Sequence, residues 1–221
     1  MQLNCEIDEA IKSKIYFAIQ SERINRYQAA SKETEASSIQ YYVWNCEISE
    51  AFYMSLHFAE IVCRNAIHSA LQFRKENVWH NDSTFRQILS PHFRDLLDLA
   101  ISDEKYQHGG KLTVHHIVSA LPFGFWEHLT TKRFERFLWP RGFQKNFPNA
   151  PAGAKLQDLH DLIESVRRWR NRIAHHQAIF DKSPSRKHQE AIMLIHWRCA
   201  ETATWVQSAS RVQKIINQRP K

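Results

Sequence analysis

The sequence predicts an all-α protein that folds as a single helical-bundle domain over residues 1–221. Only 5 Gly and 7 Pro occur in the chain, fewer than a turn-rich β protein needs. Residues 39–73 contain neither, and apolar side chains recur there at the spacing of one helix face. The 13 Phe and 7 Trp need packing partners, which indicates a sizeable core.

Apolar residues at helical spacing predict the helical segments in order. These segments are 7–28, 39–73, 85–101, 112–121, 126–137, 156–180 and 187–217. The segment 39–73 is expected to be one long helix, or two nearly collinear helices, and to be largely buried. Neither an internal repeat nor a linker separates the segments, which favours one bundle.

Turn-forming residues predict the breaks between these segments. The breaks are residues 31–38, Asn81-Asp82-Ser83, Gly109-Gly110, Pro122-Phe123-Gly124, residues 142–154 and Ser183-Pro184-Ser185. Asn81-Asp82-Ser83 is also expected to supply the N-cap of the next helix. Pro91 marks either a first helical turn or a break.

Charge and cysteine usage favour a cytoplasmic protein with an anionic partner. The formal net charge is +7, which mildly favours nucleic acid. Residues 1–14 do not resemble a signal peptide, and no apolar run approaches the roughly 18 residues that span a bilayer, so no membrane partner is expected. The cysteines form no C-x-x-C pair and are expected to be reduced core thiols; they are Cys5, Cys46, Cys63 and Cys199.

The densest group of chemically active residues is the run Arg170-Asn171-Arg172-Ile173-Ala174-His175-His176. It offers two guanidiniums that can hold a phosphate, an amide that can orient it, and two imidazoles, a group suited to proton transfer near neutral pH. The run contains no carboxylate, so it does not resemble a hydrolase centre built on Mg²⁺ or Zn²⁺. Neither a metal nor another cofactor is expected.

Helix geometry separates the members of this run. Asn171 and His175 are four residues apart and share one face, whereas Arg172 and His176 share another. Arg170 and His175 are five apart, which places them about 140° from each other on an ideal helix. The two can meet one substrate only across a helix end or a groove, or with the second copy of the run in a dimer.

These residue types match the cleavage of RNA by its own 2′-hydroxyl. The hydroxyl attacks the adjacent phosphate, so the protein has to move protons and stabilise the charge of the transition state. A histidine can act as general acid or base, and an arginine fork fits the phosphate oxygens. DNA lacks the 2′-hydroxyl, so RNA is the favoured substrate. The same residues at a helix end can instead cap carbonyls or form surface ion pairs.

Basic and aromatic residues elsewhere are weaker candidates for RNA binding. Arg167, Arg168 and Arg172 either follow an RNA backbone or line a solvated helix face. A second basic patch either follows an RNA backbone or is a solvated helix face. An aromatic cluster either stacks on bases or packs in the core. The patch is Lys132, Arg133, Arg136, Arg141 and Lys145, and the cluster is Phe123, Phe125 and Trp126.

Glu60, Arg64 and Asn65 are candidates for a supporting role. Glu60 and Arg64 form an i,i+4 pair, which is either an ordinary intrahelical ion pair or an element that orients the catalytic helix. Adjacent histidines, as in His115-His116 and in the run itself, diverge by about 100° on a helix and suit one metal poorly. The absence of H-E-x-x-H and C-x-x-C signatures also disfavours a metal site.

Four further segments accompany the run 170–176 in a characteristic order. They are Tyr42-Val43-Trp44-Asn45, Ala59-Glu60-Ile61-Val62-Cys63-Arg64-Asn65-Ala66-Ile67, Leu121-Pro122-Phe123-Gly124-Phe125-Trp126-Glu127-His128-Leu129 and Phe137-Leu138-Trp139-Pro140. Together these segments, over about residues 21–205, resemble the Abi-like (abortive infection) family of bacterial proteins. That family belongs to the HEPN superfamily of helical ribonucleases.

The resemblance implies a HEPN-type bundle with long paired helices and RNA cleavage without metal. It also implies a homodimer in which both copies of the motif face a shared cleft. Arg170 corresponds to the motif arginine, Asn171 to its polar neighbour and His175 to the motif histidine, with His176 as the alternative. Family members often continue with Glu-Pro where this chain has Gln177-Ala178, a departure that affects the helix end or the orientation of His176.

Three functions follow as hypotheses. The first is a metal-independent endoribonuclease of the anti-phage (abortive infection) or toxin type. The second is a non-catalytic RNA-binding module, to which the net charge and the Gln177-Ala178 departure point. The third is a helical interaction protein, such as one half of a toxin–antitoxin pair that is covered by an antitoxin or another regulatory partner.

Overall fold

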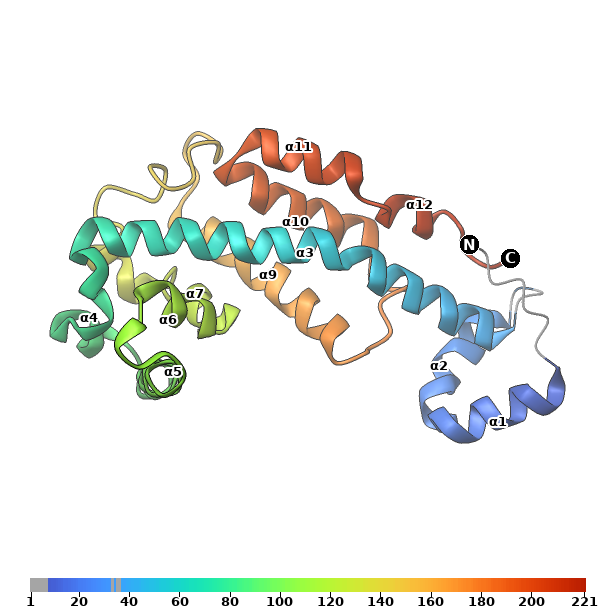
Figure 1. Ribbon diagram of the computed structural model, residues 1–221. Helices are drawn as coiled ribbons and strands as arrows, with labels where there is room; N and C mark the ends of the chain where they lie inside the picture. The colour runs from blue at the N-terminus through green and yellow to red at the C-terminus, as the bar shows by residue number, and fades with distance from the viewer. Residues whose placement is uncertain (1–7, 33, 35–36) are drawn as a thin grey trace. The chain divides into compact units, whose positions relative to one another are not determined.

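A computed structural model describes residues 8–32, 34 and 37–221 (Figure 1). Regular structure in these residues is entirely helical, so the predicted all-α class is confirmed. The described residues form two compact units. Unit 1 comprises those within Met1–Tyr53, Arg172–Ser185 and Ser210–Lys221, and unit 2 comprises Met54–Asn171 and Arg186–Ala209. No helix among the described residues is long and apolar enough to cross a membrane.

The long helix predicted at 39–73 is present as α3 (Ser38–Lys75), which can be followed in Figure 1. It is one helix of 38 residues, as the absence of Pro and Gly predicts. Buried side chains recur along it every three or four positions and form a core-facing stripe. This stripe includes Ile48, Phe52, Leu56, Ala59, Cys63 and Ala66.

Unit 1 begins with two short helices where the sequence predicts a single one at 7–28. They are α1 (Glu9–Ile19) and α2 (Ser21–Ser31), and residue 7 lies outside the described part. Gln20 interrupts the helix, because its φ of 64° and ψ of 144° lie outside the helical region. Asp8 caps α1 by accepting a hydrogen bond from the Ala10 N–H at 3.0 Å. Part of the predicted loop 31–38 also lies outside the described residues.

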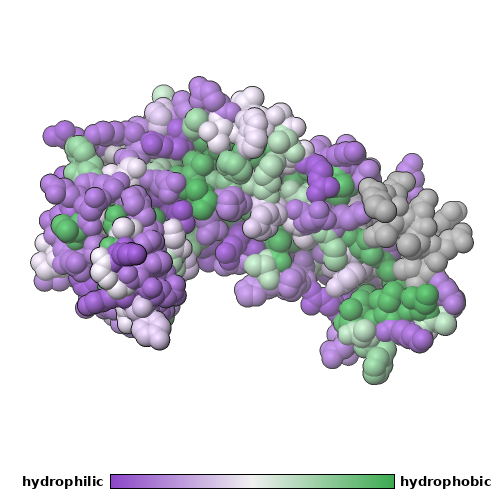
Figure 2. Space-filling view, in the orientation of Figure 1, coloured by the Kyte–Doolittle hydropathy of each residue, from purple (hydrophilic) through white to green (hydrophobic). Residues whose placement is uncertain are grey.

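Aromatic rings hold the interior of unit 1 together. Tyr27 and Phe180 lie 5.3 Å apart between ring centroids, and Trp44 contacts Phe180 at 6.1 Å. The Trp44 indole N–H donates to the Ile215 carbonyl at 2.8 Å, which ties α3 to α12 (Val212–Ile216). Burial raises the pKa of Tyr27 to about 12, so its hydroxyl is neutral at physiological pH. By contrast, α1 exposes the apolar side chains of Ile11 and Phe17. Figure 2 shows hydrophobic surface, in green, over the region of α1 and α2.

Asn45 fastens the segment 179–180 to α3 within unit 1. Its buried side-chain oxygen accepts hydrogen bonds from the backbone N–H groups of Ile179, at 2.7 Å, and Phe180, at 3.2 Å. Only Gln177 and Ala178 separate this segment from the run 170–176. Asn45 therefore helps to fix the backbone on the C-terminal side of the two histidines.

Replacing Asn45 by alanine is expected to lower the free energy of unfolding by about 2–3 kcal/mol, because two backbone donors lose their acceptor. Urea denaturation measures this change. Ser49→Ala is a matched control on the same helix, since its hydroxyl only donates to the Asn45 carbonyl at 2.8 Å. The control is expected to lose less than about 1 kcal/mol. Equal losses in the two variants contradict this role of Asn45.

Unit 2 contains the remaining helices and several short 3₁₀ turns. In chain order the α-helices are α4 (Ser83–Ile88), α5 (Pro91–His108), α6 (Val114–Ala120), α7 (Phe123–His128), α8 (Glu135–Leu138), α9 (Leu156–Ala174), α10 (Pro184–Arg198) and α11 (Ala200–Ala209). The last residues of α9 and the first of α10 belong to unit 1. Residues 142–154 form the predicted loop.

Several predicted boundaries are confirmed and others are wrong. Asp82 caps α4 by accepting from the Phe85 N–H at 2.8 Å, and Pro91 occupies the first turn of α5. The segment 126–137 is not one helix: α7 ends at His128, and α8 follows a 3₁₀ turn at Lys132–Phe134. The segment 187–217 is likewise divided into α10, α11 and α12.

The core of unit 2 is rich in aromatic and imidazole rings. The cluster at the start of α7 is buried, which places Phe123, Phe125 and Trp126 in the core and not on a base-stacking surface. His68 is also buried, with its ring 6.4 Å from that of Trp126. Burial lowers the pKa of His68 to about 4, and burial has the same effect on His128, whose ring stacks on Phe93 at 4.2 Å.

The thiols differ in their surroundings, so the expectation of four core cysteines is wrong in part. Cys5 lies outside the described residues. Cys63 is fully buried, and burial raises the pKa of its thiol. Cys46 is exposed and Cys199 is partly exposed. Only Cys63 of the three described cysteines has the buried position that the sequence predicts.

Candidate functional site

The run 170–176 lies at the C-terminal end of α9, and the helix ends earlier than the sequence predicts. One face of α9 is buried, through Leu159, Leu162, Ile163, Val166 and Trp169. The helix stops at Ala174, six residues before the expected end at residue 180. Arg170 and Asn171 are thus helical, whereas His175 and His176 occupy the turn that follows. Both histidines are exposed.

The turn after α9 has the hydrogen bonds of a Schellman cap. The His176 N–H donates to the Ile173 carbonyl, and the Gln177 N–H donates to the Arg172 carbonyl, both at 2.9 Å. His176 has a φ of 53°, the left-handed conformation that glycine usually adopts at this position. The prediction that Arg172 and His176 share a helix face is therefore wrong, because the backbone turns at His176.

This turn also bears on the departure from the Glu-Pro pattern. The cap uses only the backbone N–H of Gln177, which a glutamate at that position supplies equally well. A glutamate at position 177 would therefore leave the helix end unchanged and would add one negative charge beside His176.

In unit 2 the side chain of Arg170 is held by a carboxylate from another helix. Its Nε lies 3.4 Å from Oε2 of Glu60 on α3, and its Nη1 donates to Oδ1 of Asn171 at 3.3 Å. Nearly half of the Arg170 side chain remains exposed, at 46%. A guanidinium has five N–H donors, so these two contacts leave others for an anion from solvent.

Glu60, Arg64 and Asn65 are polar residues in the part of α3 that belongs to unit 2. Within the described part of the chain, the ion pair of Glu60 is with Arg170 and not with Arg64, although these two are four residues apart. Arg64 donates from Nε to Oδ1 of Asn65 at the long distance of 3.5 Å. Burial lowers the pKa of Arg64, and the Glu60 carboxylate opposes this effect. The Glu60 carboxylate thus acts on two guanidiniums, those of Arg64 and Arg170.

The other arginines near the run have different partners. Arg167 donates from Nε and Nη2 to the two carboxylate oxygens of Glu127 on α7, the second at 3.2 Å. Arg168 pairs with Glu164 one turn earlier at 2.7 Å and is exposed. Through its contact with Glu127, Arg167 links α9 to α7. RNA binding by Arg167, Arg168 and Arg172 stays a prediction.

Replacing Arg167 by methionine is expected to lower the free energy of unfolding by about 2–4 kcal/mol, because the largely buried Glu127 carboxylate loses its fork-shaped partner. Urea denaturation measures the loss. Arg168→Met removes an exposed i,i+4 pair and should change stability by about 0.5 kcal/mol or less. A loss in Arg167→Met no larger than in this control rules out the linking role.

In unit 1, His176 lines a pocket of about 460 Å³. The other polar lining residues are Arg23, Tyr42, Asn45, Cys46 and Ser49. The Arg23 guanidinium donates to the His176 carbonyl and so connects α2 to the turn after α9. The pocket therefore brings a cation, hydroxyls and a thiol beside one of the two histidines. Sequence reasoning missed Arg23, Cys46 and Ser49, which lie far from the run along the chain.

The second basic patch is divided among several environments in unit 2. Lys132 and Arg136 line a pocket of about 740 Å³ together with Lys155. Arg133 instead donates to the Ile88 carbonyl at 3.1 Å, and the Lys145 ammonium lies over the Phe73 ring at 3.7 Å. The patch is not one continuous surface that follows a phosphate backbone.

Comparisons with models of protein families, with curated proteins and with solved structures find no match to this chain.

Proposed function

We propose that the protein is an endoribonuclease of the Abi-like, HEPN type that cuts RNA without a metal ion. The observation that carries the proposal is the partly exposed guanidinium of Arg170, held by Glu60 and Asn171, five residues before an exposed histidine in the same run. An arginine, an amide and imidazoles are sufficient for cleavage by the 2′-hydroxyl, because that reaction needs charge stabilisation and proton transfer only.

Arg170 has the task of stabilising the scissile phosphate. Its remaining N–H donors contact the non-bridging oxygens and strengthen as negative charge develops in the transition state. Glu60 limits the rotamers of the arginine, which lowers the entropy lost when RNA binds. The Glu60 carboxylate also competes with the RNA phosphate for the N–H donors of Arg170. The transition state carries more negative charge than the ground-state phosphate, so it competes for these donors more strongly.

His175 is the proposed proton-transfer residue, and His176 is proposed to support it. Both are exposed, so RNA in solution can reach either imidazole. The backbone of His176 serves the cap of α9, and its neighbour Arg23 adds positive charge at the pocket that His176 lines. Asn171, one turn before His175, orients the guanidinium of Arg170.

The physiological setting that fits this chemistry is the bacterial cytoplasm, with RNA as the target during phage infection or toxin action. A homodimer brings two copies of the run to one RNA, as the HEPN resemblance implies. An antitoxin or another regulatory partner fits the same setting, because unrestrained RNA cleavage is toxic to the cell that makes the enzyme.

The proposal is tested by incubating purified protein with RNA in EDTA, beside Arg170→Ala and His175→Ala. Wild type is expected to cut, and both variants are expected to lose at least about 100-fold in rate. Cleavage that needs a divalent cation, or that persists in both variants, contradicts the mechanism. RNA that is bound in a salt-sensitive manner but left intact by wild type indicates the non-catalytic RNA-binding module instead.

A further inference from the structure

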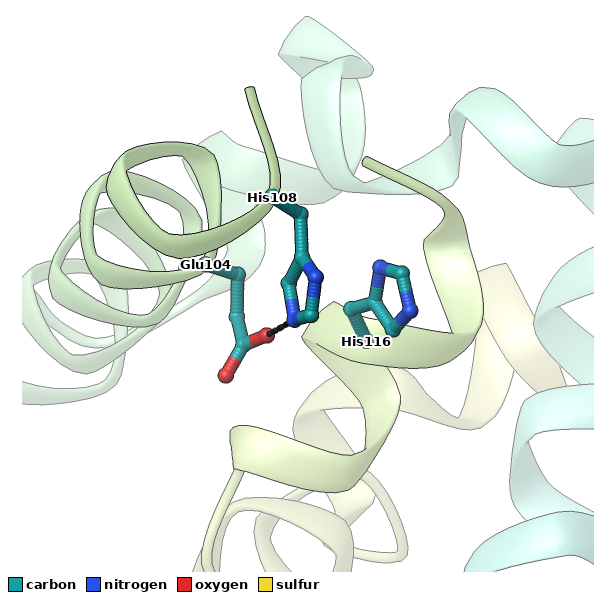
Figure 3. Close-up of side chains that lie close together, drawn as sticks. All are labelled: Glu104, His108 and His116. Atoms are coloured by element: carbon teal, nitrogen blue, oxygen red, sulfur yellow. Dashed lines mark ion pairs between the residues drawn. The ribbon is translucent and has the colours of Figure 1, made fainter. Parts of the chain in front are cut away.

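Two imidazoles and a carboxylate gather between α5 and α6 in unit 2, away from the residues of the proposed ribonuclease (Figure 3). They belong to Glu104, His108 and His116, and their ligand atoms all lie within 4.8 Å of one another. Nε2 of His108 is 3.2 Å from Oε2 of Glu104. All three side chains are partly exposed, so an ion from solvent can reach them.

The local fold explains why these residues meet. Glu104 and His108 are four residues apart in the last turns of α5 and share one face. Gly109 then reverses the chain with a φ of 54° and a ψ of −128°, a conformation that is strained for residues with a side chain. After a short 3₁₀ turn, α6 returns His116 to the face of α5 that carries Glu104 and His108.

The neighbouring histidine points to a different environment. His115 lies with its ring centroid 5.9 Å from that of the buried His68, whereas the His116 ring stacks on His108 at 3.8 Å. The different ring neighbours of His115 and His116 agree with the divergence expected of adjacent side chains on a helix. It means that a cation at this hairpin involves only one member of His115-His116, with the other ligands supplied by α5.

The donor set is one that zinc prefers. Zn²⁺ binds imidazole nitrogen and carboxylate oxygen at about 2.0–2.2 Å, which puts ligand atoms of a tetrahedral site about 3.4 Å apart. The separation of 3.2 Å between Glu104 and His108 is close to this value without any movement. Three protein ligands on a partly exposed surface leave the fourth position to water.

Coordination requires His116 to turn. Its ring now lies nearly parallel to that of His108, at an interplanar angle of 12°, so their in-plane lone pairs do not converge. Its Nδ1 also accepts a hydrogen bond from the Thr113 N–H at 3.2 Å. Rotation of the partly exposed His116 side chain removes both obstacles, at the cost of the ring stacking and of the hydrogen bond from Thr113. The resulting affinity is expected to be micromolar, below that of a preformed structural zinc site.

We propose that Glu104, His108 and His116 bind Zn²⁺ and thereby clamp the α5–α6 hairpin. The sequence predicts no metal site, because the ligands follow no recognised spacing and meet only through the turn at Gly109. The clamp is independent of the RNA chemistry, which the proposed mechanism performs without metal.

The test is a titration of the full-length protein, free of any histidine tag, with Zn²⁺ in competition with a chromogenic chelator. Two variants remove ligands, Glu104→Gln and His116→Ala. Their matched controls are the adjacent Asp103→Asn and His115→Ala. Wild type and controls are expected to bind one Zn²⁺ more tightly than the ligand variants by about tenfold or more. Equal affinity in ligand variants and controls overturns the site, as does wild type that binds no Zn²⁺ at 100 µM, a concentration about a hundred times the expected dissociation constant.

Thermal unfolding and Co²⁺ binding give independent readouts. Zn²⁺ that binds the folded hairpin raises the melting temperature of wild type and both controls, because it stabilises only the native state. No such rise is expected in Glu104→Gln or His116→Ala. Co²⁺ should give the intense visible absorption of a four-coordinate ion with wild type but not with His116→Ala. A rise in melting temperature that persists in both ligand variants places the metal elsewhere.

Discussion

Replacing Arg170 by alanine is expected to reduce the rate of RNA cleavage about 10³-fold, because the transition state loses its charge-assisted hydrogen bonds. The fold should survive, since the Arg170 side chain is about half exposed and its ion pair with Glu60 is a surface contact at 3.4 Å. Cleavage of a short fluorescent RNA in EDTA measures the rate. Circular dichroism establishes that the variant is folded.

Three further variants test whether the effect belongs to the charge and geometry of Arg170. Arg170→Lys keeps the charge but not the fork, and should recover only part of the lost rate. Glu60→Gln loosens the Arg170 guanidinium and should lower the rate by about tenfold. Arg186→Ala removes an exposed arginine that pairs with Glu190 one turn away, outside the proposed site, and should leave the rate within about twofold of wild type. Loss of cleavage in Arg186→Ala as large as in Arg170→Ala contradicts a specific role for Arg170.

Acidification from pH 7 to pH 5 is expected to lower the free energy of unfolding by roughly 2 kcal/mol for each of His68 and His128. Burial lowers the pKa of both to about 4 in the folded protein, whereas histidine in an unfolded chain has a pKa of about 6.5. Between these values the unfolded state binds more protons than the folded state. Stability is therefore complete above pH 6.5 and is lost as the pH falls towards 4.

Urea denaturation at pH 7, 6 and 5 measures this loss. His68→Gln and His128→Gln each remove one titrating group, so each should reduce the pH-dependent loss by roughly 2 kcal/mol, whatever the stability of the variant at pH 7. The loss that remains includes His80 and His188, whose pKa values are also lowered by burial. His115→Gln is the graded control: His115 lies beside His68 and adds a smaller contribution than burial to the lowered pKa of His68, so this variant should reduce the pH-dependent loss by less than His68→Gln does. An unchanged loss of stability in the His68→Gln/His128→Gln double variant contradicts the assignment.

The sequence predicts those elements that are determined by local chemistry. Apolar side chains at helical spacing, together with the absence of Pro and Gly through residues 39–73, predict α3, and the Asp82 side chain predicts the cap of α4. The breaks at Gln20 and His176 could not be predicted in this way. Both residues have positive φ without being glycine, so their backbone conformation depends on packing and on the Arg23 contact to His176, not on their own propensity.

The candidate site was predictable as a set of residue types but not as an arrangement. Arg170, Asn171 and the two histidines stand together in the sequence. Their partners do not. Glu60 is 110 positions before Arg170, and its i,i+4 spacing from Arg64 favours an intrahelical ion pair instead. The choice between the two depends on how α3 and α9 pack in unit 2. The cluster of Glu104, His108 and His116 could not be predicted either, because its members meet only where the chain reverses at Gly109 and α6 packs beside α5.

The most direct test of the ribonuclease account is the chemistry of the cut ends. Wild-type protein should cut RNA in EDTA to give fragments with 2′,3′-cyclic phosphate and 5′-hydroxyl ends, because the 2′-hydroxyl is the nucleophile. A matched RNA with a single 2′-deoxy substitution at the cut position should resist cleavage there. Fragments with 3′-hydroxyl and 5′-phosphate ends, or cleavage at the 2′-deoxy position, contradict the account, since either result requires water as the nucleophile.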